Sequence, residues 1–487
     1  MKKYIYKSAT ELAELIRKGN ATSTQIIKEH FEQIKLHNND LNAIVINFEK
    51  EALLEAECCD KETLEGKYRG PLHGVPITVK EQFWIKGVKS TLNFKMLKNW
   101  RATTDAVIIE RLKNAGAIII GKTNVPKNLT DSQVNGDIYK EGKNPYDLNL
   151  TPGGSSGGSA TAIASGMTPI GLGSDLGGSI RNPANFCGLY GLKPTESTIP
   201  LQGAMPNFSN TKGFVFHMAQ AGPLARNIED IELLWSVIKG EHNSDRTVSP
   251  IKWKDCDDLT CNDFKISWID SWSGYMPSSE TKNVISSFIK KIEDSGFKIT
   301  NTKPPELLHQ KTLSLSMRLF SQLISQSIPW YIKPLVKIQL KKGLLKGVKL
   351  YNKEINNGFK DSFKYYSETM GIRAEIISEW ETYFEKNDIL ICPTGFGPAF
   401  KRSKIGEPII YNGKKIKYFD YVWPYLGCFN GSGHPCLTIP LGLNKEGLPI
   451  GIQIVGAYWS EPKLIQFTKL ISKFNTNFIQ PPNYKSR

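Results

Sequence analysis

The sequence lacks the cysteine spacings of metal sites and any long apolar run. Its eight cysteines include no Cys-x-x-Cys pair and no matched histidine spacing, so we expect free thiols rather than structural zinc or a disulfide framework. No apolar stretch approaches the roughly 18 residues that a membrane-spanning helix needs. The chain begins Met1-Lys2-Lys3, but polar residues soon follow where a signal peptide has its apolar segment. We therefore expect a cytoplasmic protein.

Negative charge is also scarce. The 487 residues include 62 lysines and arginines against 47 acidic residues, which gives a formal net charge of +15. Such an excess of positive charge is typical of proteins that bind nucleic acid or an anionic membrane surface, and it also occurs in proteins where it only increases solubility. No recognised nucleic-acid-binding motif accompanies it, so we expect no nucleic-acid partner.

What is present is the composition of a globular α/β protein, with 40% hydrophobic and 22% charged residues. Capping boxes at Ser8 and Thr22 open two helices, and residues 1–65 are expected to form an N-terminal helical part packed on the core. Further along, strands and helices are expected to alternate, which predicts a layered fold with helices on both sides of a largely buried sheet. The expected elements include helices at 105–114 (opened by Asp105), 159–165, 228–239 and 280–294, and strands ending at Lys80 and at 117–120, 169–172, 264–269, 389–392, 437–441 and 450–455.

The stretch 151–194 is unusually rich in glycine. Nine glycines precede Ile180, and two turns carry serine, GGSSGG at 153–158 and GGS at 177–179. Glycine makes sense where backbone N–H groups approach a ligand closely or the chain takes conformations that other residues avoid. Two serines held in such turns indicate nucleophilic chemistry.

These segments resemble the amidase signature family of amide hydrolases. GGSSGG followed by GSDLGGSIRNPA at 173–184 is similar to the family's serine-bearing region, and PLHGVPITVK at 71–80 resembles its catalytic-lysine strand. The resemblance implies a single amidase domain over 1–487, built on one large mixed β-sheet covered by helices on both sides. It also implies hydrolysis of a small-molecule carboxylic acid amide to the acid and ammonia or an amine, without cofactor or metal.

The resemblance assigns roles to individual residues. Ser179 is the expected nucleophile that forms an acyl-enzyme, Ser155, preceded by a cis peptide bond, relays the proton, and Lys80 is the base. Lysine accepts a proton only when neutral, so Lys80 should be buried enough for its pKa to fall from roughly 10.4 towards about 7 to 8. The resemblance further implies an oxyanion hole formed by the backbone N–H groups of Leu176, Gly177, Gly178 and Ser179, with Ser156, Asp175 and Arg181 in supporting roles.

Two details leave alternatives open. Leu176 stands where threonine or isoleucine is usual in the family, which leaves the shape of the acyl pocket open. Ser155 and Ser156 also suit helix N-cap positions, and capping and catalysis can coexist.

Two other segments contain the residue types of known sequence motifs at the right spacing. GAIIIGKT at 116–123 fits the phosphate-binding pattern G-x-x-x-x-G-K-T, but its middle residues are themselves expected to form a strand rather than a loop. GGSSG at 153–157 fits the nucleophile elbow of α/β-hydrolases, which needs a histidine partner. Only His73, His217 and His434 lie near motif-like sequence, and His434 is expected to be a turn or packing residue.

Two other functions remain open. The first is the glutamine-hydrolysing amidase component of a glutamyl-tRNA amidotransferase, a member of the same family. Against it, TESTIPLQGAMPN at 195–207 does not resemble the Tyr-Gly-Leu-Val stretch that such subunits carry after Lys-Pro-Thr. The second is a non-catalytic binding protein on the same fold, which the occupied positions Lys80, Ser155 and Ser179 disfavour. A homodimer is possible in either case.

A different composition follows the prolines at 304 and 305, and we expect a variable insert or cap at 305–375 near the substrate channel. Its segment 307–353 holds nine basic residues and no acidic one. Leu313, Met317, Phe320, Ile324 and Ile328 form the stripe of an amphipathic helix that ends at Pro329. Phe320 and Trp330 are expected to wall an acyl pocket for apolar amides. Weak peripheral membrane contact through 307–353 is a second possibility.

Overall fold

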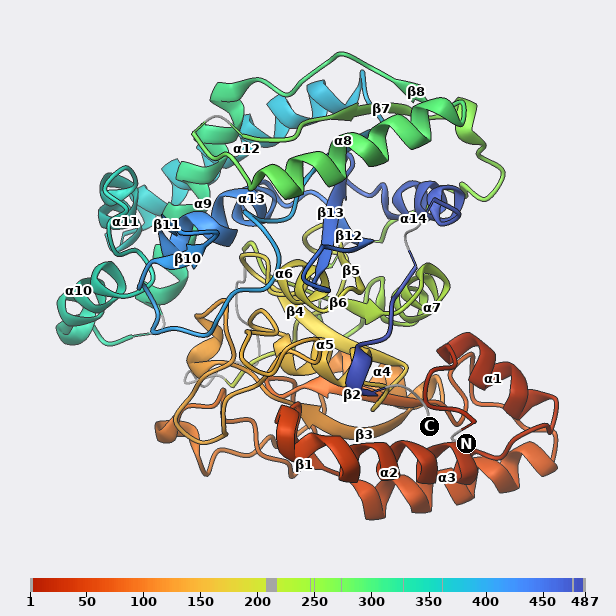
Figure 1. The fold of residues 1–487 in the computed structure, drawn as a ribbon. Coiled ribbons are helices and arrows are strands. Elements are labelled where there is room, and N and C mark those ends of the chain that lie inside the picture. The colour runs from red at the N-terminus through yellow and green to blue at the C-terminus, as the bar shows by residue number, and fades with distance from the viewer. Residues whose placement is uncertain are drawn as a thin grey trace.

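The computed structural model describes residues 3–206, 217–245, 247–248, 250–272, 274–326, 328–360, 362–474 and 477–484. Eleven strands form one mixed sheet, and Figure 1 shows them running from β1 and β3 at the bottom to β7 and β8 at the top. In spatial order they are β1 (Ile44–Asn47), β3 (Ile118–Thr123), β2 (Pro76–Lys80), β4 (Ile170–Asp175), β6 (Gln220–Ala225), β5 (Tyr190–Lys193), β12 (Cys436–Leu443), β13 (Pro449–Val455), β9 (Ile389–Pro393), β7 (Lys265–Trp268) and β8 (Lys298–Ile299). The large mixed sheet expected from the resemblance is confirmed.

Parallel and antiparallel pairs occupy different parts of the sheet. β2 pairs in parallel with β3 and β4, and β7 does so with β8 and β9. The strands between β4 and β9 are all antiparallel to their neighbours. Because β2 and β4 are parallel neighbours, their carboxyl ends meet at one edge of the sheet.

Fourteen α-helices lie within the described residues. They are α1 (Ala9–Arg17), α2 (Ser23–Leu41), α3 (Glu49–Leu64), α4 (Val107–Asn114), α5 (Gly157–Ala164), α6 (Arg181–Phe186), α7 (Ile228–Ile238), α8 (Ser279–Asp294), α9 (Glu306–Gln326), α10 (Lys333–Lys342), α11 (Asn352–Gly358), α12 (Phe363–Phe384), α13 (Tyr418–Ser432) and α14 (Glu461–Ile471). A small hairpin of β10 (Ile409–Tyr411) and β11 (Lys414–Ile416) lies outside the main sheet. None of the described helices is long and apolar enough to span a membrane.

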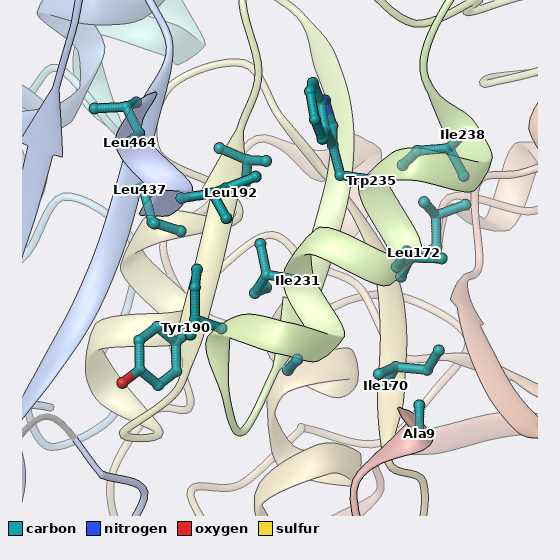
Figure 2. Packing of buried hydrophobic residues seen from close by; sticks show 14 of the residues in the cluster. Ala9, Ile170, Leu172, Tyr190, Leu192, Ile231, Trp235, Ile238, Leu437 and Leu464 are labelled. Atoms are coloured by element: carbon teal, nitrogen blue, oxygen red, sulfur yellow. The ribbon is translucent and has the colours of Figure 1, made fainter. Parts of the chain in front are cut away.

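Alternate side chains of the strands enter separate apolar cores, as the two-residue period of a strand requires. In β9, Ile389 and Ile391 join the core beneath α1, α4, α7, α8 and α14. Leu390 and Cys392 join the core beneath α9, α12 and α13. Figure 2 shows the first core around α7, whose Trp235 and other apolar side chains lie against strands of the sheet. Both faces of the sheet are therefore covered.

The first two helices begin where the sequence predicts. Both capping boxes form, with the Ser8 and Thr22 hydroxyls accepting from the N–H groups of Glu11 and Gln25. Helices α2 and α3 pack against Ile118 and Ile120 of β3. Helices α2 and α3 thus lie against the end of the sheet that holds β1 and β3.

Two helix boundaries differ from expectation. The prediction that Asp105 opens a helix is wrong, because α4 begins at Val107 and its N-cap residue is Ala106. The Asp105 carboxylate instead accepts from the N–H of Lys86 at 2.7 Å and pairs with Lys113. The helix predicted to continue to Pro329 ends at Gln326, so Ile328 lies beyond it.

Candidate active site

Lys80 ends β2 and is fully buried, at the sheet edge where β2 and β4 terminate together. Its Nζ lies 2.7 Å from Ser155 Oγ, 2.8 Å from Ser174 Oγ and 3.2 Å from the carbonyl oxygen of Ser174. Burial lowers the pKa of the Lys80 amine well below its usual value, although the charge of Asp175 opposes the shift. The amine is therefore in an environment that favours its neutral form.

Gln82 and Ser174 fix the direction of the hydrogen bonds at Lys80, and sequence reasoning missed both. Gln82 Nε2 donates to the carbonyl of Ala204 at 2.7 Å, which turns its Oε1 towards Ser174. The Ser174 hydroxyl donates to that Oε1 at 2.6 Å. With its hydrogen committed there, Ser174 Oγ can only accept from Lys80. The one sequence signal for Gln82 is its position two residues after Lys80.

Ser155 and Ser156 connect the first serine turn to the second. The peptide bond between Gly154 and Ser155 is cis, as the resemblance implies, and Ser155 is 2% exposed. The N–H of Ser156 donates to the carbonyl of Ser179 at 3.1 Å, which holds the two turns side by side. Ser156 occupies the N-cap position of α5, but its side chain makes no capping hydrogen bond. Its hydroxyl instead donates to the carbonyl of Ser174 at 3.2 Å.

The turn after β4 presents Ser179 at a partly open position. Leu176, Gly177 and Ser179 are partly exposed, whereas the Lys80 amine and Ser155 lie beneath the surface. In the part of the chain that the structure describes, no hydrogen bond joins the hydroxyls of Ser155 and Ser179. Catalytic hydrogen bonds are often loose before substrate binds, so the relay expected between these two serines is compatible with this arrangement.

The predicted oxyanion donors differ in availability. The N–H of Gly178 donates to Asp175 Oδ1 at 2.7 Å, so it is engaged within the protein. Helix α13 packs closely behind the turn: a Cβ on Gly177 would lie 2.4 Å from the Trp423 ring, and one on Gly178 2.5 Å from Leu426. A side chain at either position would therefore force Trp423 or Leu426 to move. Gly178 also has φ +107°, which disfavours any side chain.

Asp175 and Arg181 form a buried ion pair that holds the turn. Both side chains are fully buried, with Arg181 Nε 3.0 Å from Asp175 Oδ2. Burial by itself raises the pKa of the Asp175 carboxyl, but the charge and hydrogen bonds of Arg181, together with the Asn430 hydrogen bond and the Lys193 charge, more than offset it, so the net pKa lies well below the usual value. Asp175 also accepts from the N–H of Ile180 at 3.1 Å. These contacts hold the turn in place, and the supporting role of the pair in catalysis stays a prediction.

Asn430 on α13 completes the network, and no sequence pattern indicated it. Its Nδ2 donates to Asp175 Oδ1 at 2.9 Å and to the carbonyl of Met218 at 3.0 Å. Its Oδ1 accepts from Arg181 Nη2 at 2.5 Å. Gln453 of β13 accepts from Arg181 Nη1 at 3.0 Å. The turn is thus positioned by residues about 250 and 270 positions further along the chain.

Lys122 is a second buried lysine, and it belongs to the phosphate-loop lookalike. Residues Ile118–Thr123 form β3, so the prediction that this segment is a strand rather than a loop is confirmed. Burial lowers the pKa of Lys122 to about 8. Its Nζ donates to Ser90 Oγ at 2.6 Å and to the carbonyl of Lys89 at 2.7 Å, whereas Ser155 contacts Lys80.

The three histidines named from the sequence make their hydrogen bonds elsewhere, so the described contacts give Ser155 no histidine partner. His434 is fully buried between the Ser432 hydroxyl and Glu381, which confirms it as a packing residue. The other contacts are His217 to Tyr366 and Glu196, and His73 to Thr63 and the carbonyl of Cys59. The structure also brings His73 near Cys59 Sγ and Glu62, a proximity the sequence did not indicate. Arg69 already pairs with Glu62 there.

Comparison with known proteins settles the family. The sequence matches the family described as Amidase over residues 25–465. The chain belongs to the amidase signature family. Among curated relatives, the A subunit of the glutamyl-tRNA(Gln) amidotransferase of Caldanaerobacter subterraneus subsp. tengcongensis is 30% identical over 95% of each chain. The protein of the same name from Bacillus velezensis is 31% identical over 93% of this chain and 94% of its own.

Solved structures share the amidase signature fold. The structure of 6-aminohexanoate cyclic dimer hydrolase with substrate superposes with a TM-score of 0.81 at 23% identity, covering 99% of this chain and 100% of its own. Fatty acid amide hydrolase superposes with a TM-score of 0.80 at 24% identity, covering 97% and 86%. The resemblance inferred from the sequence is confirmed, and this amidase signature protein is an enzyme that acts on amide C–N bonds.

Proposed function

We propose that this amidase hydrolyses carboxylic acid amides through an acyl-enzyme on Ser179, with Ser155 as proton relay and Lys80 as base. The hydrogen-bond pattern at Lys80 carries the proposal. A neutral amine has two N–H donors and one lone pair, and Lys80 Nζ has three close contacts. The carbonyl and hydroxyl oxygens of Ser174 can only accept, since the Ser174 hydrogen is given to Gln82. The lone pair of the neutral Lys80 amine can then accept a hydrogen bond from the O–H of Ser155.

The reaction follows from this arrangement. Lys80 takes the proton of Ser155, Ser155 takes that of Ser179, and Ser179 Oγ bonds to the amide carbon. Free backbone N–H groups of the turn, with Leu176, Gly177 and Ser179 as the candidates, stabilise the oxyanion. The C–N bond then breaks as the proton returns through Ser155 to the leaving nitrogen. Water attacks the acyl-enzyme by the same relay and releases the acid and Ser179.

Apolar side chains beside the turn support amides with an apolar acyl group as substrates. Trp423 packs against Gly177, and the ring of Phe320 on α9 lies 5.0 Å from the Trp423 ring, centroid to centroid. Leu176 packs against the same core. Phe320 therefore keeps its proposed place in the acyl wall. Trp330 does not, because it is 80% exposed.

A second candidate is the glutamine-hydrolysing component of an amidotransferase. The names of the curated relatives favour it, since their similarity covers nearly the whole of both chains. The sequence at 195–207, which lacks the Tyr-Gly-Leu-Val stretch of such subunits, speaks against it. Copurification with two other subunits and ammonia release dependent on glutamine would favour this candidate. A homodimer and a cytoplasmic location stay predictions.

A fluorophosphonate probe tests the proposal directly. We expect the probe to label the wild-type protein and not Ser179→Ala, and a panel of amides, glutamine included, to compete with it. Ser236→Ala, at an exposed serine of α7, is the matched control and should label fully. Equal labelling of wild type and Ser179→Ala would overturn the assignment of the nucleophile. An absence of labelling in wild type would favour the third candidate, a non-catalytic binding protein.

A further inference from the structure

Helix α10 turns an apolar face outwards. None of its residues is buried, nor is any in the short 3-10 helix Trp330–Ile332 before it. The exposed fractions are 80% for Trp330, 66% for Tyr331, 56% for Leu335 and 48% for Ile338. Leu335 and Ile338 are three residues apart within α10, so they lie on one side of this helix. A soluble helix normally buries such a face, so this orientation needs an explanation.

The neighbouring helix α9 shows the usual orientation. Its Leu313, Met317 and Phe320 enter the core with α12 and α13. Leu340 of α10 packs against the same core, so Leu335 and Ile338 are exposed even though an apolar core lies nearby. Figure 1 shows α10 at the edge of the molecule, away from the sheet. Exposed apolar side chains gathered on one element mark an interaction site.

The sequence segment that contains this face carries charge of one sign. Within the described residues, Lys337, Lys342, Lys346 and Lys349 pair with no acidic side chain, and the segment 307–353 contains none. Elsewhere in the segment, Lys311 pairs with Glu379 and Arg318 with Glu354. We call the four exposed apolar residues together with these four lysines the α10 surface. Aromatic rings beside lysines are typical of the boundary between water and an anionic membrane.

We propose that the α10 surface binds an anionic lipid membrane, with Trp330, Tyr331, Leu335 and Ile338 inserted at the headgroup level. Lysines can extend their amines to the phosphates while their methylene chains follow the apolar side chains. A second copy of this chain fits less well, because a symmetric contact would bring two identical basic surfaces together. The binding is peripheral and salt-sensitive, and it does not depend on the proposed function.

Cosedimentation with vesicles tests this proposal on the full-length protein. Vesicles of phosphatidylcholine with about 30% phosphatidylserine are compared with pure phosphatidylcholine at low and high salt. We expect binding to the anionic vesicles at low salt and at least a tenfold loss of affinity at about 1 M salt, where the screening length falls to about 3 Å. Triple replacement Trp330→Ser, Leu335→Ser, Ile338→Ser should abolish binding.

Charge controls separate the local surface from overall charge. Replacement of Lys337, Lys342, Lys346 and Lys349 by glutamine should weaken binding about tenfold or more. Replacement of four exposed lysines on other parts of the fold, Lys61, Lys98, Lys298 and Lys445, removes the same charge and should have little effect. Hydrolysis of a small soluble amide, or probe labelling, checks that each variant is folded.

Quenching by lipids brominated on the acyl chains adds a readout of depth. The fluorescence of wild type should be quenched, and Trp330→Phe should lose most of that quenching. Absence of binding to anionic vesicles at low salt would overturn the proposal. Dimerisation in solution that the triple replacement abolishes, without vesicle binding, would assign the surface to a second copy instead. If replacing either set of four lysines weakened vesicle binding equally, the protein would be attracted by its overall charge only. That result would also overturn the proposal.

Discussion

The turn that carries Ser179 and the α10 surface differ in which side chains they bury and which they expose to water. In the turn, charged and polar groups are buried, and Asp175, Arg181 and Asn430 hold one another in one arrangement. On α10, large apolar groups stand in water with lysines beside them. A buried charge tolerates few arrangements because an unpaired one is costly. An exposed apolar side chain changes the free energy of folding little. It contributes to function only when a binding partner covers it.

The contrast implies different consequences of substitution. Changes to Asp175, Arg181 or Asn430, which hold the turn, should affect turnover and stability together, because each of these side chains has several partners. Changes on α10 should leave both nearly untouched and affect only association with lipid. The following experiments test that separation, beginning with the largest expected effect.

Ser179→Ala should lower kcat on any amide substrate about 10⁶-fold, as loss of a catalytic nucleophile does in serine hydrolases. The side chain is partly exposed, so the variant should keep the thermal stability of wild type. Steady-state hydrolysis and a melting curve give both values. Substantial residual turnover would place the nucleophile elsewhere, whereas Ser236→Ala should behave as wild type.

Lys80→Arg should lower kcat on the order of 10³- to 10⁴-fold, because arginine stays protonated and cannot act as base. The same reasoning gives the pH dependence of wild type. The pKa of Lys80 is lowered by burial, so the active neutral form gains population as pH rises through that lowered pKa and is lost below it. A kcat/KM profile from acid to alkaline pH measures the midpoint.

Lys122→Met is the control for this profile. The pKa of Lys122 is also lowered, to about 8, but its amine contacts Ser90 rather than the serine turns. Its replacement should leave the midpoint in place. A midpoint that disappears with Lys122, or a flat profile in wild type, would contradict the assignment of Lys80 as base.

The sequence motifs are enough to name the proposed catalytic residues, because these residues lie within short segments of unusual composition. Lys80 at a strand end, the serines at 155 and 179, and the glycines at 177 and 178 can all be placed without a structure. The alternation of elements and the two capping boxes likewise predict the layered fold and the first helices. Local chemistry decides these features.

The part of the site that the sequence does not predict depends on contacts between residues far apart along the chain. Asn430 and Gln453 reach the turn only because α13 and β13 pack beside it, and a lone asparagine or glutamine carries no pattern of its own. Gln82 matters because Ala204 orients its amide, 122 positions away. The sequence allows membrane contact through 307–353, but it does not predict which apolar side chains of α10 are exposed, because the packing of the whole fold decides that.

Gln82→Ala should lower kcat about 10- to 100-fold, the effect of losing a buried hydrogen bond worth about 1–3 kcal/mol. Without Gln82, the Ser174 hydroxyl is free to donate to the lone pair of Lys80 and compete with Ser155. The double variant Gln82→Ala, Ser174→Ala removes this competing hydroxyl and should recover part of kcat. KM should change little in both. A double variant slower than the single one would contradict this orienting role.

Asn430→Ala should lower the free energy of unfolding by about 1–3 kcal/mol and kcat about tenfold or less. The loss leaves Arg181 Nη2 and the carbonyl of Met218 each short of a buried partner. A melting curve shows the first effect and the kcat against KM comparison the second, since a misplaced turn changes kcat more than KM. Asn114→Ala, at an exposed asparagine, should change neither. Unchanged stability and kcat in Asn430→Ala would remove Asn430 from the positioning network.

The smallest effect is expected on α10 and is measured with one chemical change at two sites. Ile391→Val removes a methylene from a fully buried strand residue and should cost about 0.5–1.5 kcal/mol, seen as a lower Tm. Ile338→Val makes the same change on a side chain that is 48% exposed, so stability should stay within about 0.5 kcal/mol of wild type. Both variants should hydrolyse a soluble amide at the wild-type rate. If Ile338→Val lowered the Tm as much as Ile391→Val, the α10 face would be packed against the protein in solution, and the contrast between the two regions would be lost. If the stability stays unchanged, the apolar face of α10 contributes nothing to folding, and its composition calls for a partner outside the chain.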